Sequence, residues 1–158
     1  MKALSIGRWQ AICDLEATHA AYSNWDKWGK NSCRCIHCKN FFAAIDQAYP
    51  TSFVTLLESL GIRPGQETEV YHNARMDYGL HNYGGWFYFV GTLLAGADGW
   101  TQVDDTLRTP AFEQITDHFK YGLSSKPNWI PPPFENQRIV TVEFNTEIPW
   151  ILSEVEPS

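Results

Sequence analysis

The chain has 158 residues, of which 44% are hydrophobic and 19% charged, and a formal net charge of −6. These values are typical of one globular domain and exclude a disordered or fibrous protein. An acidic chain lacks the concentrated Lys and Arg that neutralise phosphates, so we expect no nucleic-acid ligand. No apolar run is long enough to span a membrane, and Arg8 lies where a signal peptide would be apolar. We therefore expect a cytoplasmic protein with no membrane partner.

Residues 1–64 contain three segments whose apolar residues follow helical spacing. The first predicted helix spans 5–22, and the second spans 38–49 and ends before Pro50. The third starts from a cap at residue 51 or 52 and ends at Gly61, which suits a left-handed C′ position. Residues 23–32, which lie between the first two helices, are predicted to form a loop.

Residues 66–152 are predicted to form the sheet part of the chain. Segments 68–72, 86–94 and 138–144 are rich in β-prone residues, and a further strand is expected from about residue 116. A short helix from Pro110 is the alternative for that last segment, and 96–110 is predicted to be a surface loop. Together these elements predict a single α+β domain over 1–158, with three N-terminal helices packed on a mainly antiparallel sheet of about four strands.

All four cysteines lie in the first 38 residues, and three of them form the sequence Cys33-Arg-Cys35-Ile-His-Cys38. Three thiolates at a helix start make half of a shell for zinc, which takes four Cys or His ligands in tetrahedral geometry. We therefore predict a structural zinc ion on these three residues. The sequence leaves the fourth ligand open among Cys13, His19, His37, His72 and His81.

Other interpretations of the cysteines remain open. Cys13 lies on the apolar face of the first predicted helix, where a buried cysteine behaves as a small hydrophobic residue. Cys33 and Cys38 can form a disulfide, although a reducing cytosol disfavours it. Cys38 is also a candidate nucleophile, because a helix N-terminus and neighbouring basic residues lower a thiol pKa.

The histidines and aromatic residues of the β-rich part form a second group of candidate binding residues. His72 and His81, with nearby carboxylates, allow acid–base or metal chemistry, and a hairpin with surface histidines is the alternative. Trp86, Trp129 and Phe134 offer rigid contact area. The last two lie on a proline-rich strap, for which a loop that covers an edge of the core is the favoured alternative. The late carboxylates are expected to form a solvated acidic end: Glu143, Glu147, Glu154 and Glu156.

Three motifs occur in a fixed order along the chain: Cys35-Ile-His-Cys38-Lys-Asn-Phe41, Leu60-Gly-Ile62 and Tyr83-Gly-Gly-Trp86. In these motifs the chain resembles a group of small bacterial proteins of uncharacterised function. That group shares a C-x-x-C-x-N-F segment, an L-G-I turn and a Y-G-G-W strand. The resemblance implies a single-domain bacterial protein, and it implies no activity, cofactor or catalytic residue.

These observations favour a non-enzymatic cytosolic binding module for a protein or a small molecule. One form is an immunity or inhibitor protein with a structural zinc site, whose acidic surface speeds its encounter with a basic toxin. The alternative is a small metal- or thiol-dependent enzyme that uses the cluster Cys33, Cys35 and Cys38 with His72 or His81. Metal content and thiol reactivity distinguish the two.

Overall fold

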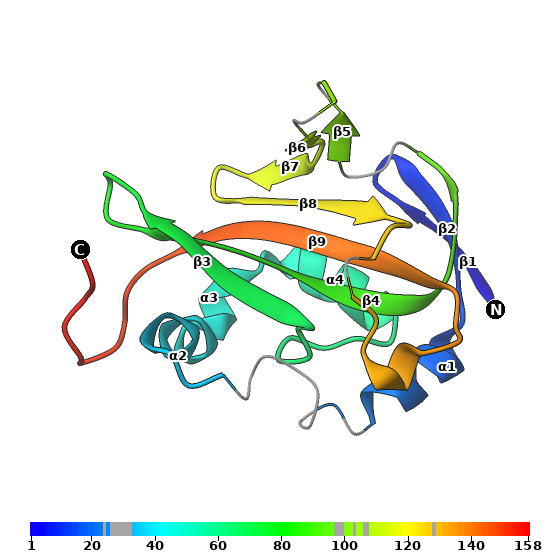
Figure 1. Cartoon of the computed structure of the whole chain (residues 1–158), viewed down its shortest axis with the longest axis horizontal. Helices are drawn as coiled ribbons and strands as arrows, with labels where there is room; N and C mark the ends of the chain where they lie inside the picture. The colour runs from blue at the N-terminus through cyan, green and yellow to red at the C-terminus, as the bar shows by residue number, and fades with distance from the viewer. Residues whose placement is uncertain (24, 26–32, 97–99, 103, 106–107, 128) are drawn as a thin grey trace.

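The computed structural model describes residues 1–23, 25, 33–96, 100–102, 104–105, 108–127 and 129–158. Within these residues the main element is an antiparallel sheet of seven strands, in the order β1-β2-β4-β9-β8-β7 with β3 paired to β4 (Figure 1). The strands of this sheet are β1 Lys2–Ile6, β2 Trp9–Cys13, β3 Glu69–Arg75, β4 His81–Ala95, β7 Glu113–Thr116, β8 Phe119–Ser124 and β9 Ile139–Ile148.

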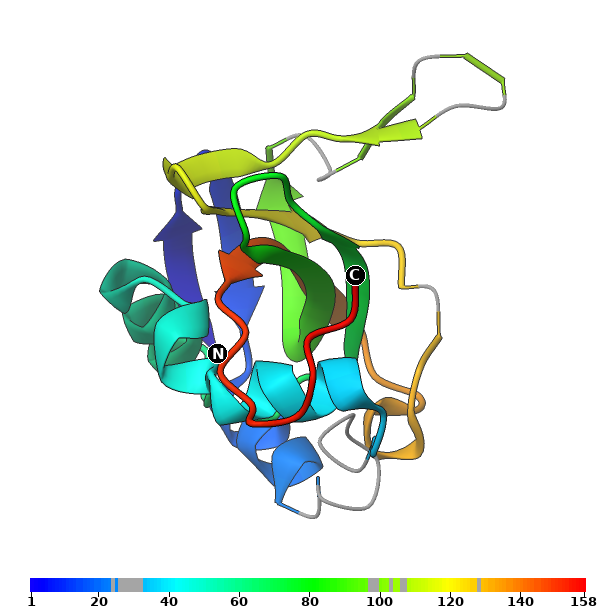
Figure 2. The same cartoon turned by 90° about the vertical axis from the view of Figure 1, so that its left-hand side faces the viewer.

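Four short α-helices and one 3₁₀ helix accompany the sheet in the described part of the chain. They are α1 Leu15–Tyr22, α2 Ile36–Ala43, α3 Ile45–Ala48, α4 Thr51–Ser59 and η3 Pro132–Phe134. Helices α2, α3 and α4 lie together on one side of the sheet (Figure 2). The predicted class, mixed α and β, is confirmed, but the predicted arrangement of three helices on about four strands is wrong.

The largest error concerns the N-terminus, where residues 2–13 form the hairpin β1–β2 instead of the first part of a helix. The side chains of Trp9, Ala11 and Cys13 are buried on one face of β2, which is the alternation of a strand. Gly7 adopts a positive φ of 54° in the turn, where a glycine is favoured. The helix begins only after Asp14, whose side chain accepts a hydrogen bond from the backbone N–H of Ala17.

The predicted third helix is confirmed as α4, and the predicted second helix is divided into α2 and α3. Phe53 and Leu57 of α4 are buried against the sheet, and the ring of Phe53 contacts the rings of Phe87 and Phe144. Gly61 ends the helix with a φ of 78°. This packing forms the hydrophobic core between the helices and the concave face of β4, β8 and β9.

Strand β4 extends the predicted strand 86–94 to fifteen residues and pairs with β9 along ten of them. Both of its faces are covered, as its apolar sequence predicts. Phe87 and Phe89 lie in the main core, while Tyr88 on the opposite face packs against Phe134 of η3. The hydroxyl of Tyr22 donates to the backbone oxygen of Tyr88 and accepts from its N–H, so α1 satisfies β4 at the edge between its pairings with β3 and β2.

The remaining predictions for the β-rich part are confirmed in part. The predicted strand 138–144 is β9, and the strand expected from about residue 116 is β8, which pairs with β7. The predicted loop 96–110 contains the two-stranded pair β5 Trp100–Gln102 and β6 Arg108–Pro110, and its other residues lie partly outside the described ones. The predicted loop 23–32 falls almost entirely outside them. No helix in the described part of the chain has the length and apolar character needed to cross a membrane.

Candidate metal centres

The structure brings the three cysteines Cys33, Cys35 and Cys38 together at the start of α2. Cys35 is the N-cap of this helix, and its extended backbone directs Sγ over the first turn, where it accepts from the Cys38 N–H at 3.4 Å. The Sγ atoms of Cys33 and Cys35 are 3.5 Å apart, and all three Sγ atoms lie within 4.8 Å of one another. All four cysteines of the chain are free thiols. The trio is therefore arranged to hold a metal ion that prefers sulfur.

The three cysteines differ in their exposure to solvent: Cys35 is exposed, Cys33 is half-buried and Cys38 is buried. Burial raises the pKa of the Cys38 thiol, and the hydrogen bonds that this thiol donates to Cys35 and Cys33 raise it further. A buried thiol in this state is protonated at neutral pH, and a bound metal ion displaces such a proton.

The structure does not bring Cys13 to this trio. Its Sγ lies on β2, 3.9 Å from the backbone oxygen of Leu60 and 4.0 Å from Oγ1 of Thr18, in the hydrophobic core. His19, another candidate for the fourth ligand, is exposed on α1. Among the described residues, the sulfur group contains three ligands and no fourth one.

A second group consists of three histidines from three different elements: His37 of α2, His72 of β3 and His81 of β4. One ring nitrogen of each lies within 4.8 Å of the others. Nε2 of His72 is 2.8 Å from Nδ1 of His81, and the ring of His37 is stacked on that of His72 with centroids 3.9 Å apart. From the sequence we grouped His72 with His81, and we named His37 only as a candidate fourth metal ligand beside the cysteines. His37 meets the two strands only through the tertiary fold, so the spacing of the histidines in the sequence could not predict this contact.

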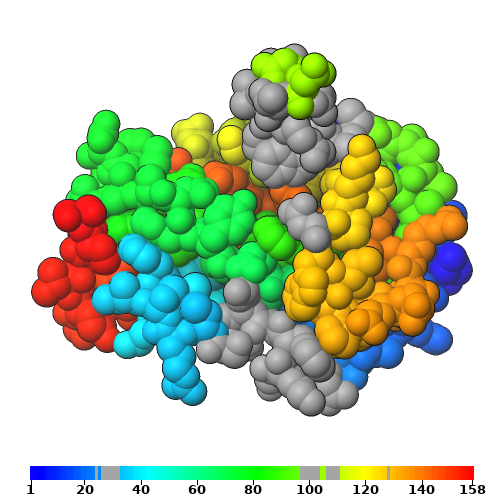
Figure 3. Space-filling model, in the orientation of Figure 1, coloured from blue at the N-terminus to red at the C-terminus, as the bar shows by residue number. Residues whose placement is uncertain are grey.

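The C-terminal segment 149–158 packs against the histidine group from outside. Glu156 Oε1 is 2.7 Å from Nε2 of His81 and 2.9 Å from Nε of Arg75. The ring of Trp150 contacts the ring of His81 at 5.3 Å between centroids. Figure 3 shows these C-terminal residues beside α2 and the β3–β4 hairpin at one end of the molecule.

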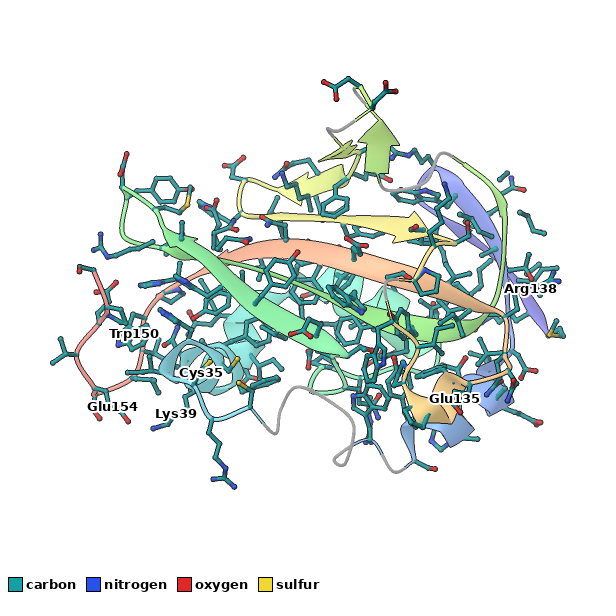
Figure 4. All side chains as sticks on the ribbon, in the orientation of Figure 1. Cys35, Lys39, Glu135, Arg138, Trp150 and Glu154 are labelled. Atoms are coloured by element: carbon teal, nitrogen blue, oxygen red, sulfur yellow. The ribbon has the colours of Figure 1, made fainter. Side chains whose placement is uncertain are left out.

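Helix α2 also holds this C-terminal segment in place. The Asn40 side chain donates to the backbone oxygen of Pro149 and accepts from the N–H of Ile151. Lys39 forms an ion pair of 2.7 Å with Glu154, and both are labelled near Cys35 and Trp150 in Figure 4. Of the late carboxylates that we expected to be solvated, Glu154 is exposed and Glu156 half-buried, and both pair with basic side chains. Glu143 is buried, so the expectation is wrong for this residue.

Burial favours the neutral imidazole at two of the three histidines, His72 and His37. Burial lowers the pKa of His72 to about 4, with further lowering by His37 and His81. Burial also lowers the pKa of His37. Hydrogen bonds from His81 and Arg75 lower the pKa of Glu156, which keeps this carboxylate charged. Neutral imidazole is the form that binds metal ions.

The predicted aromatic contact residues lie in different environments. Phe134 is fully buried against Tyr22 and Trp25, so its side chain belongs to the core and not to the surface of the strap. Trp129 is 51% exposed, and its backbone oxygen accepts from the Tyr88 hydroxyl. Trp86 is half-buried and donates through Nε1 to the same hydroxyl at 3.1 Å.

A polar hollow of about 430 Å³ lies near the β3–β4 hairpin, and its lining includes Asn82, His118 and Lys120. Asn82 follows His81 on β4, and successive side chains of a strand point to opposite faces. The hollow therefore opens on the face opposite to the histidine group.

Comparisons of the chain with protein-family models, curated proteins and solved structures find no match. The resemblance to small bacterial proteins therefore stays a prediction, and the function is argued from the geometry of the clusters.

Proposed function

We propose that this protein is a zinc-binding module in which Cys33, Cys35 and Cys38 hold the ion in a structural role. The observation that carries the proposal is the convergence of the three Sγ atoms within 4.8 Å of one another. Tetrahedral zinc–sulfur bonds of about 2.3 Å set a spacing of about 3.8 Å between bound sulfur atoms. The Cys33–Cys35 distance of 3.5 Å is already close to this spacing. Binding then requires only small movements of the side chains.

The first turn of α2 places a hydrogen-bond donor at one of the proposed ligands. The Cys38 N–H donates to Cys35 Sγ, and the positive end of the helix dipole stabilises negative charge at the same place. The described residues supply three ligands, which leaves one position for solvent or another ligand. In the reducing cytoplasm, where we place the protein, the thiols stay available for metal. A bound ion would fix the first turn of α2 to the residues that precede it.

An enzyme that uses a thiol nucleophile receives less support. Such a cysteine needs a lowered pKa, whereas burial raises the pKa of Cys38. We therefore favour a metal-holding role for the trio over a catalytic one.

Cobalt substitution tests the zinc proposal, because Co²⁺ bound to thiolate has sulfur-to-metal charge-transfer bands that imidazole ligands do not produce. The full chain, purified without a histidine tag or chelator, should show these bands with Co²⁺ and lose them on addition of Zn²⁺. The variant Cys35→Ser/Cys38→Ser should lack them, and the matched control Cys13→Ala should retain them. Bands that persist unchanged in the double variant would contradict the assignment.

A second function, recognition of a basic protein, is proposed from a different observation. Glu69, Trp86 and Glu143 are direct cross-strand neighbours on β3, β4 and β9, so their side chains share one face of the sheet. The ring of Tyr71 lies over Gly84 beside this row, where an added Cβ would be 2.5 Å from the ring. Glu143 is buried, so the accessible part of this row is the pair of rings Tyr71 and Trp86, whose centroids are 6.2 Å apart. This pair suits an Arg or Lys side chain of a partner through cation–π contact. The net charge of −6 favours the encounter.

Titration with a short arginine-rich peptide, followed by tryptophan fluorescence, tests this surface. We expect salt-sensitive binding that Trp86→Ala weakens, while Tyr78→Ala, a change at an exposed aromatic residue of the β3–β4 turn, leaves it intact. Equal binding by the wild-type chain and Trp86→Ala would exclude the row as the recognition surface.

A further inference from the structure

We propose that His37, His72 and His81 form a second metal site, for a divalent transition-metal ion that prefers imidazole nitrogen, such as Zn²⁺, Ni²⁺ or Cu²⁺. The site shares no ligand with the cysteine trio, and the inference does not depend on zinc at that trio. Its ligands come from α2, β3 and β4, so the fold itself brings them together.

The distances suit one ion between the rings. Metal–nitrogen bonds of about 2.0–2.1 Å place two bound nitrogen atoms about 2.8–3.4 Å apart, for angles between octahedral and tetrahedral values. Nε2 of His72 and Nδ1 of His81 are 2.8 Å apart, and the nitrogen of His37 lies within 4.8 Å of both. The His37 ring is stacked on His72 with planes 11° apart, so it must turn out of the stack before its nitrogen lone pair points to an ion held in the plane of His72. This turn, with a small opening of the His72–His81 pair, completes three-nitrogen coordination.

The hydrogen bonds of His81 indicate which of its ring nitrogens is free to bind a metal ion. A carboxylate only accepts hydrogen bonds, so the contact of Glu156 with Nε2 of His81 requires the proton on Nε2. Nδ1 of His81 then holds its lone pair toward His72. In the metal-free state His72 donates its Nε2 proton to that lone pair. With metal bound, His72 carries its proton on Nδ1 instead, so that Nε2 of His72 and Nδ1 of His81 both offer lone pairs to the ion.

His37 distinguishes a metal site from a simple hydrogen-bonded clamp. A chain from His72 through His81 to Glu156 would attach the C-terminal segment to the sheet without any third histidine. Nδ1 of His37, however, is buried and makes no hydrogen bond to any described residue. Unpartnered buried polar atoms are uncommon because they lose their hydration without compensation. We infer that Nδ1 is the nitrogen that His37 turns to the ion, which gives this buried atom a partner.

Glu156 completes the outer layer of the site. Metal-binding histidines commonly donate their second ring N–H to a carboxylate, which fixes the tautomer and the ring orientation. Glu156 has this relation to His81 and is itself fixed by Arg75 at 2.9 Å. Trp150 covers the His81 ring. Three nitrogen ligands with a hydrogen-bonded carboxylate fit borderline metal ions better than Mg²⁺ or Ca²⁺, which prefer oxygen.

The test uses the full chain with Cys33→Ser/Cys35→Ser/Cys38→Ser, so that thiolates contribute nothing. This chain should bind one equivalent of Cu²⁺, with nitrogen hyperfine coupling in the electron paramagnetic resonance spectrum. Adding His72→Gln should weaken binding by more than the roughly 10- to 100-fold loss typical of an outer-shell partner. The matched control His19→Gln, at an exposed histidine of α1, should change neither affinity nor spectrum.

A parallel measurement keeps the proposal testable if the cysteine-free chain does not fold. In the chain with its cysteines, His72→Gln should lower the zinc content by one equivalent and leave the Co²⁺–thiolate bands unchanged. If only the cysteine site does not bind metal, the Co²⁺–thiolate bands will be absent while the Cu²⁺ signal remains. A folded chain that binds no Cu²⁺ through nitrogen, or a His72→Gln variant with undiminished affinity, would overturn the histidine site.

Discussion

Replacing Leu57 with alanine tests how α4 packs against the sheet. The Leu57 side chain is fully buried and belongs to the same core cluster as Phe53 and Phe144. The substitution removes three carbon atoms, which at about 0.8 kcal/mol per buried CH₂ costs about 2.4 kcal/mol of transfer free energy. The cavity that remains adds to this cost, so we expect the free energy of unfolding to fall by about 2–5 kcal/mol in total.

Urea unfolding followed by circular dichroism measures this loss, with an unchanged m-value expected for a loss of stability alone. For a chain of this length the midpoint temperature should fall by about 5–15 °C. The matched control is Glu58→Ala, at an exposed position of the same helix, which should change stability by less than about 0.5 kcal/mol. An unchanged midpoint for Leu57→Ala would show that another face of α4 is buried.

Three further predictions concern a buried carboxyl group, the strap and the histidine site. Burial raises the pKa of Glu67, so the folded chain holds this proton more tightly than the unfolded chain and loses stability as the pH rises above about 4. Glu67→Gln should remove this decline, which urea unfolding at about pH 5 and about pH 8 measures. Phe134→Ala should lower the free energy of unfolding by about 3–5 kcal/mol because the ring is buried, whereas Trp129→Ala should cost less than about 0.5 kcal/mol; equal costs would contradict the difference in burial. Glu156→Gln should weaken Cu²⁺ binding about 10- to 100-fold and preserve the Co²⁺–thiolate bands, and unchanged Cu²⁺ affinity would separate Glu156 from the site.

The sequence predicted elements well where one periodicity dominates. In α4 the apolar residues recur only at helical spacing, and in β9 the β-prone run has no helical alternative. The N-terminal segment allows two interpretations, because Trp9, Ile12 and Cys13 match a helix while Trp9, Ala11 and Cys13 match a strand. Pairing of β2 with β4 decides between them, and that pairing depends on residues far along the chain.

The cysteine cluster and the histidine cluster also differ in how far the sequence could predict them. The three cysteines lie within six residues, so their spacing alone predicts a common ligand set. His37 meets His72 and His81 only because α2 packs beside the β3–β4 hairpin, and no local pattern shows this packing. Phe134 illustrates the opposite error: a proline-rich context suggested an exposed strap, but the ring fills the space beside Tyr88.

Both clusters depend on the first turn of α2, where His37 and Cys38 are adjacent. This turn is held from the core side, because the buried Tyr83 hydroxyl donates to the backbone oxygen of His37 at 2.9 Å. Asn40, also fully buried, donates to the same hydroxyl at 3.4 Å and binds the C-terminal segment. Successive helical residues point about 100° apart, so His37 can face the strands while Cys38 joins the cysteine trio. Tyr83 and Asn40 thus position the helix turn that contributes to both proposed metal sites.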